Sequence, residues 1–139
     1  MRSNAAGKES RIAKALLLVD VIKDFQHEGG RLLASFRERH PALRRTLEDA
    51  RARGTAVVYA NDNAGTWTSD VPELLRRAIE NGEGGDLVSE VAPRDDEAVV
   101  LKPRYSAFDA TPLETLLRER DVDEVVVAGT ATESASSRR

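Results

Sequence analysis

The chain contains no cysteine, and this absence excludes several kinds of chemistry. Without a thiol, its 139 residues can form no disulfide, no cysteine-ligated zinc site and no thiol nucleophile. A chain without cysteine is compatible with a reducing compartment, and we expect a cytoplasmic protein. The two histidines, His27 and His40, have no partner ligands at metal-binding spacing. The sequence therefore predicts no metal and no cofactor.

Charge and hydropathy argue against two further classes of partner. The 21 basic and 24 acidic residues are interspersed and give a net charge of −3, so no basic stripe is available for nucleic acid. The apolar runs are far shorter than the ~20 residues of a membrane helix, so no membrane contact is expected. Residues 1–10 lack the hydrophobic region of a signal peptide. We expect a disordered lead-in over residues 1–13 and one domain over residues 14–139.

Four short apolar runs predict the strands of a parallel sheet. The runs cover residues 14–21, 55–62, 98–103 and 124–129. Amphipathic segments with helical spacing lie between them, at residues 31–53, 71–81 and about 113–120. We expect Pro41 to divide the first segment into two helices. Alternation of strands and helices predicts right-handed βαβ units, and hence an α/β fold with helices on both faces of a parallel sheet.

Two local signals refine the connections between these elements. Thr111, Pro112 and Glu114 have the spacing of a capping box, which predicts Thr111 as the N-cap and Pro112 as the first helical residue. The glycine-rich segment Gly82–Gly85 is interpreted as a plain surface turn. No glycine-rich phosphate motif follows any strand, so a nucleotide-binding Rossmann domain is disfavoured.

Polar residues follow the predicted strands at their carboxyl ends, where open parallel sheets bind ligands. Asp20 follows the first strand, Asn61–Asn63 end the second, and Lys102 ends the third. Asp20 could cap the turn after its strand, and Lys102 could extend its amino group to water. Together they could instead form an ion pair in a cleft, in which the carboxylate takes a proton and the ammonium stabilises developing charge.

Four motifs, in this order, resemble those of the isochorismatase-like cysteine hydrolases. They read LLLVDVIKDFQHEGG, NDNAGTW, KPRYSAFDATPL and VVVAGTATES, and together they span about residues 14–134. The second resembles the branch of the family with the pattern N-D-N-x-G-x-W. The resemblance implies a three-layer, doubly wound parallel sheet with strand order 3-2-1-4. It also implies a small-molecule substrate with an amide, imine or enol-ether-like group.

The resemblance further implies a catalytic site. In this family an aspartate, a lysine and a cysteine form a triad, so Asp20 corresponds to the general base and Lys102 to its electrostatic partner. Thr130 and Ala131 correspond to a region that shapes the oxyanion hole, often through a non-proline cis peptide. The residues expected to line the pocket are Phe25, Asn61, Asn63, Trp67, Tyr105 and Phe108. Packing in the core is the alternative role for the aromatic residues.

The chain departs from the family pattern at the nucleophile. Alignment of Gly129 and Thr132 places the cysteine position at Ala135, whose methyl group cannot attack a substrate. We therefore expect a member of this hydrolase family that is inactive in its present form. The alternative is a non-catalytic relative that was kept for binding or assembly.

A second departure concerns the end of the chain and its assembly. The family continues beyond the position of Arg139 through a helix and further βα units, so the last units of the fold are expected to be missing. Without a fifth strand, Val125–Val127 would form an open, apolar sheet edge. Such an edge favours pairing with another chain. The sequence therefore predicts a homo-oligomer, specifically a symmetric dimer.

Overall fold

The computed structural model describes residues 13–23, 25, 31–62, 70–81, 83–102, 112–129 and 134–137. Its elements are β1 (Lys14–Val19), α2 (Arg31–Ala52), β2 (Ala56–Asp62), α3 (Val71–Arg76), the π-helical turn η2 (Arg77–Asn81), α4 (Gly85–Glu90), β3 (Ala98–Lys102), α5 (Leu113–Glu119), β4 (Glu124–Gly129) and β5 (Ser134–Ser137). The predicted lead-in lies outside the described residues except for Ala13, whose N–H donates to Asp123 Oδ2 at 3.2 Å.

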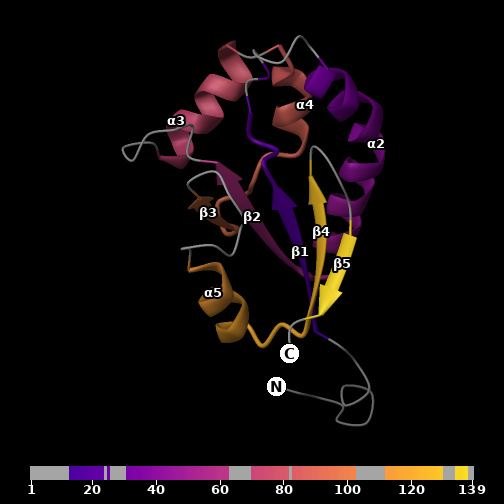
Figure 1. The fold of residues 1–139 in the computed structure, drawn as a ribbon, viewed down its shortest axis with the longest axis vertical. Helices are drawn as coiled ribbons and strands as arrows, with labels where there is room; N and C mark the ends of the chain where they lie inside the picture. The colour runs from indigo at the N-terminus through magenta and orange to yellow at the C-terminus, as the bar shows by residue number, and fades with distance from the viewer. Residues whose placement is uncertain are drawn as a thin grey trace.

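The sheet has the order β3-β2-β1-β4-β5, and its first four strands are parallel (Figure 1). The predicted order 3-2-1-4 is therefore confirmed. Ala15 of β1 lies opposite Ala56 of β2 on one side and Val125 of β4 on the other. All four strands consequently end at the same edge, which we call the carboxyl edge.

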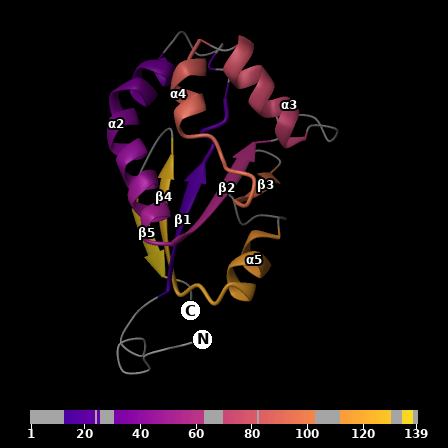
Figure 2. The same cartoon turned by 180° about the vertical axis from the view of Figure 1, so that it is seen from behind.

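Helices cover both faces of the sheet, as predicted, because successive residues of each strand point to opposite sides. In Figures 1 and 2, α2 and α4 lie on one side of the sheet, and α5 packs on the other. The first core contains Leu16, Leu18, Phe36, Leu43, Leu47, Val57, Tyr59, Leu74 and Val88. The second core contains Ala15, Leu17, Val58, Ala60, Val100, Leu113, Leu117 and Val125. The strands are thus buried on both faces, which explains their continuous apolar sequences.

Strand β5 was not predicted, and it changes the expectation for the sheet edge. It pairs antiparallel with β4, with Ala135 opposite Val126 and Ser137 opposite Glu124. The expectation that Val125–Val127 form an open edge is therefore wrong. Its sequence, SASS, is short and polar and has no strand pattern, so the pairing with β4 alone identifies it as a strand. The dimer stays a prediction, without this structural basis.

Helix α2 runs without interruption through Pro41, so the predicted division into two helices is wrong. A proline inside a helix costs about 3 kcal/mol, because it removes a hydrogen bond and crowds the preceding turn. The same helix buries Phe36, Leu43 and Leu47 almost completely. Each such side chain contributes roughly 1.5–3 kcal/mol on burial. Tertiary packing therefore outweighs the local penalty.

The two other local predictions are corrected at the starts of short helices. Gly85 is buried at the first position of α4, and an added Cβ would overlap the carbonyl oxygen of Ile79. The segment around Gly85 is therefore a packed contact rather than a plain surface turn. Thr111 lies outside the described residues, and Pro112 is the capping residue of α5, with its carbonyl accepting from Leu116 N at 2.9 Å. Helix α5 thus begins one residue later than predicted.

Candidate active site

Asp20 stands at the carboxyl edge, one residue beyond β1. Its N–H continues the sheet ladder and donates to the Ala60 carbonyl at 2.9 Å. Its φ is 57°, a left-handed conformation that aspartate adopts more readily than most residues. The chain therefore leaves the sheet sharply at this point.

Strands β1, β2 and β3 bring Asp20 and Lys102 together at this edge. Lys102 Nζ donates to Asp20 Oδ2 at 3.1 Å, and the backbone N–H of Asp62 donates to Asp20 Oδ1 at 2.8 Å. Sequence reasoning placed the two charged residues at one edge but could not identify the Asp62 contact. A backbone N–H carries no sequence signal of its own.

The two partners of this ion pair differ in exposure. The Lys102 side chain is only 3% exposed, and that of Asp20 is 26% exposed. A buried ammonium needs a counter-charge, because isolated burial of a charge is costly. Asp20 supplies that charge and is also the member that a ligand can reach. The arrangement can exchange a proton at the carboxylate while the ammonium stabilises nearby negative charge.

Asn61 lies beside this pair, at the end of β2, and is only 2% exposed. Its Oδ1 accepts from Ile22 N at 3.0 Å, and its Nδ2 donates to Ile22 O at 3.0 Å and to Asp62 O at 3.1 Å. All three hydrogen bonds go to backbone groups. The structure thus places the Asn61 amide against the loop after β1, and its predicted contact with substrate stays a prediction.

Phe25 was expected to line the pocket, with core packing as the alternative. The structure places it in the core, 4% exposed and stacked on Phe36 with ring centroids 4.9 Å apart. An added Cβ on Gly84 would lie 3.3 Å from its ring, which shows how closely the α4 side covers it. Phe25 therefore anchors the loop after β1.

The structure does not bring Ala135 to the Asp20–Lys102 pair, contrary to the prediction. Ala135 lies in β5 opposite Val126, whereas the carboxyl edge is at Gly129. Three residues along a strand correspond to about 10 Å, at roughly 3.3 Å per residue. Position 135 belongs to an antiparallel strand rather than to a turn at the edge of the sheet.

The other predicted site residues cannot be placed. Asn63, Trp67, Tyr105, Phe108, Thr130 and Ala131, with the expected cis peptide, lie outside the described residues. Among the residues that the structure does describe, no three His, Cys, Asp or Glu side chains come together as a metal site. None of the described helices is long and apolar enough to cross a membrane.

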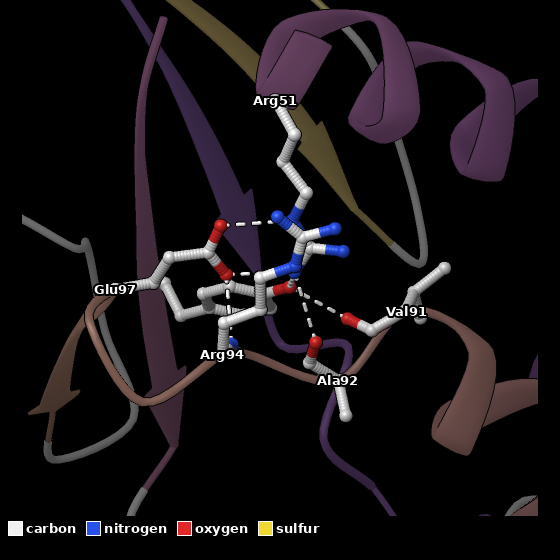
Figure 3. Close-up of polar contacts among 6 residues, drawn as sticks. Arg51, Val91, Ala92, Arg94 and Glu97 are labelled. Carbon is white, nitrogen blue, oxygen red and sulfur yellow. Dashed lines mark hydrogen bonds and ion pairs between the residues drawn. The ribbon is translucent and has the colours of Figure 1, made fainter. Parts of the chain in front are cut away.

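A second polar cluster lies at the opposite end of the sheet and has a structural role (Figure 3). Arg51, in the last turn of α2, donates to both carboxylate oxygens of Glu97, at 2.7 and 2.8 Å. It also donates to the Ala92 carbonyl at 3.0 Å, and Arg94 N donates to Glu97 Oε1 at 2.9 Å. The cluster therefore ties the end of α2 to the connection between α4 and β3.

Tyr59 extends this cluster into the core. Its hydroxyl donates to the Val91 carbonyl at 2.7 Å, and burial raises its pKa. Burial also acts to raise the pKa of Glu97, but the hydrogen bonds from Arg51 and the backbone of Arg94 outweigh it and lower that pKa. Sequence reasoning missed the cluster, because Arg51 and Glu97 are 46 residues apart.

Comparison with known proteins gives a consistent result. An Isochorismatase domain model matches residues 14–135. The chain is 34% identical over 123 residues to YaaI of Bacillus subtilis, an uncharacterized isochorismatase family protein, covering 88% of this chain and 67% of YaaI. It is 29% identical over 147 residues to the ureidoacrylate amidohydrolase RutB of Yersinia enterocolitica, covering 86% of this chain and 64% of RutB. It spans about three fifths to two thirds of the length of such curated relatives.

Solved structures show the same similarity. N-carbamoylsarcosine amidase from Thermoplasma acidophilum superposes with a TM-score of 0.61 at 26% identity, covering 85% of this chain and 68% of the amidase. An isochorismatase family protein from Desulfovibrio vulgaris superposes with a TM-score of 0.63 at 27% identity, covering 86% of this chain and 67% of that protein. The fold and the order of its strands are therefore shared with these proteins.

Proposed function

Because the chain belongs to the isochorismatase family of hydrolases, we propose that Asp20 and Lys102 form the acid–base part of a site for a small amide-, imine- or enol-ether-like substrate. The observation that carries the proposal is the ion pair of 3.1 Å between a buried ammonium and a partly exposed carboxylate. It lies at the carboxyl edge, where parallel sheets bind ligands. Two similar proteins are named as an amidohydrolase and an amidase, which supports an amide-type substrate.

In the proposed chemistry, Asp20 exchanges a proton with the bound substrate or with the group that attacks it. The ammonium of Lys102 stabilises the negative charge that develops beside it, and burial strengthens that interaction. The exposures of the two side chains support this division of roles, because the ligand can reach the carboxylate more easily than the ammonium.

We also propose that the chain is catalytically silent as it stands. A covalent step needs a nucleophile, and Ala135 offers only a methyl group. The position of Ala135 in β5 supports the same conclusion, because residue 135 pairs with Val126, three residues or about 10 Å along the strand from the end of β4. The alternative function is binding of a small molecule without turnover, or a role in assembly. Pairing of β5 with β4, in place of a turn that carries a nucleophile, favours this alternative.

The proposal is tested with two proteins. The chain as it stands is incubated with a panel of small amides, ureido acids and enol ethers, and we expect no iodoacetamide-sensitive turnover. A chimera joins residues 1–129 to the following segment of YaaI, with cysteine at the position aligned with Ala135. We expect turnover from the chimera, and none from the matched chimera with alanine at that position.

Two results would contradict the proposal. Turnover by the unmodified chain that disappears in Asp20→Asn would show that the site works without a thiol. Turnover by the cysteine chimera that survives both Asp20→Asn and Lys102→Met would show that the ion pair has no role in the chemistry.

A further inference from the structure

We propose that Asn61 is a positioning residue, which fixes the loop after β1 and thereby the Asp20 carboxylate. This inference rests on the proposed function only because that proposal assigns the Asp20 carboxylate to the active site. Asn61 is 2% exposed and all its described hydrogen bonds go to backbone groups, which supports a role through those groups.

The Asn61 amide holds Ile22 at two points. Oδ1 accepts from the N–H of Ile22 and Nδ2 donates to its carbonyl, both at 3.0 Å. An adjacent strand engages a residue through the same two backbone groups. The remaining amide hydrogen donates to Asp62 O at 3.1 Å, so both N–H groups and the oxygen of the amide are used. The side chain thus replaces a strand pairing at a point where β1 has already ended.

The loop that receives this amide is strained. Asp20 has a φ of 57° and Phe25 a φ of 54°, and neither is glycine. Such conformations persist only where the surroundings over-determine them. Val21 and Ile22, between them, are buried, so the backbone there needs hydrogen-bond partners within the protein. Asn61 supplies both partners for Ile22.

The hold on Ile22 reaches the ion pair through a short path. Asp20 is two residues before Ile22, and its Oδ1 accepts from the N–H of Asp62, the residue after Asn61. Asn61 therefore joins the two backbone segments that fix the Asp20 carboxylate opposite Lys102. Loss of the amide should let the loop relax, so that Asp20 leaves Lys102 Nζ.

The experiment compares Asn61→Leu with a matched control, Tyr59→Phe, in the full chain labelled with ¹⁵N. Leucine has a similar size but makes neither hydrogen bond to Ile22. Tyr59 lies two residues earlier in β2, is fully buried, and loses a buried hydrogen bond to Val91 O when it becomes phenylalanine. Both variants remove buried hydrogen bonds from one strand, but only the first touches the loop.

Two signals report the outcome, and neither uses turnover. We expect Asn61→Leu to reduce the hydrogen-exchange protection of the Ile22 amide at least tenfold relative to amides in the middle of β1. We also expect it to abolish the ¹H–¹⁵N signal of the Lys102 ammonium, which slow exchange in a buried ion pair makes visible. Tyr59→Phe should leave both signals as in the parent chain. The Lys102 signal is assigned by its loss in Lys102→Met.

The inference is overturned if folded Asn61→Leu keeps the Lys102 signal and the Ile22 protection at the level of Tyr59→Phe. If Asn61→Leu does not fold, Asn61→Ser replaces it in the test, since water can fill the space that the smaller side chain leaves. The inference then requires both the Ile22 protection and the Lys102 signal to weaken in Asn61→Ser. An inactive cysteine chimera together with the expected signals would reject the proposed function and keep the positioning role. An active cysteine chimera, together with unchanged signals in Asn61→Leu, would keep the proposed function and reject the positioning role of Asn61.

Discussion

The two sides of the Asp20–Lys102 ion pair should contribute unequally to the free energy of unfolding. Asp20→Asn leaves the Lys102 ammonium, 3% exposed, without a counter-charge. Removing one partner of a buried ion pair costs about 3–5 kcal/mol. Asparagine tolerates the positive φ of position 20, and its oxygen can still accept from Asp62 N, so the loss comes from the charge.

The reverse change, Lys102→Met, should cost far less. It leaves a carboxylate that is 26% exposed and still bound by Asp62 N, so water can replace the ammonium. The methionine side chain fills the buried space with apolar atoms. We expect a loss of about 1 kcal/mol, the usual net worth of one hydrogen bond. The two variants should therefore differ by at least about 2 kcal/mol.

Urea unfolding followed by far-UV circular dichroism measures these losses at neutral pH. Domains of this kind have roughly 5–15 kcal/mol of stability, so Lys102→Met should remain folded, and Asp20→Asn should remain folded over most of that range. The double variant Asp20→Asn/Lys102→Met should be more stable than Asp20→Asn alone, because it contains no unpaired buried charge. The reasoning is refuted if Lys102→Met costs as much as Asp20→Asn, or if the double variant is the least stable of the three.

Three further predictions concern the scaffold. Burial acts to raise the folded pKa of Glu97, but its hydrogen bonds to Arg51 outweigh burial and lower that pKa. The ionised Glu97 therefore stabilises the fold at pH values above its unfolded pKa, and this stabilisation is lost as the pH falls through the folded pKa. Glu97→Gln should therefore show a smaller drop in urea midpoint between neutral pH and about pH 4 than the parent chain. Gly85→Ala should lower the free energy of unfolding by about 1–3 kcal/mol, since the added methyl group meets the Ile79 carbonyl oxygen. Thermal unfolding measures the loss, and an unchanged melting temperature would contradict this packing. Pro41→Ala should raise the free energy of unfolding, measured in urea, by about 1–3 kcal/mol. A lower free energy of unfolding would show that the proline stabilises α2.

The sequence by itself determined the parallel sheet and the position of its charged pair. The apolar runs around Leu16–Leu18 and Val57–Val58 are continuous because these strands are buried on both faces, and that pattern is local. Parallel strands linked by helices must end at one edge, so the pattern predicts Asp20 and Lys102 at the same edge although 82 residues separate them. The strand order came from the resemblance between motifs, because periodicity alone does not order strands.

Only the tertiary structure decided what surrounds that pair. The hold of Asn61 on Ile22 and the bonds of Arg51 to Glu97 join segments 39 and 46 residues apart, and neither spacing has a local pattern. Helix α2 continues through Pro41 because burial of its neighbours outweighs a local penalty. Strand β5 pairs with the edge of β4 although its polar sequence, SASS, has no distinctive strand pattern. Interactions of this kind depend on which surfaces the completed fold brings into contact.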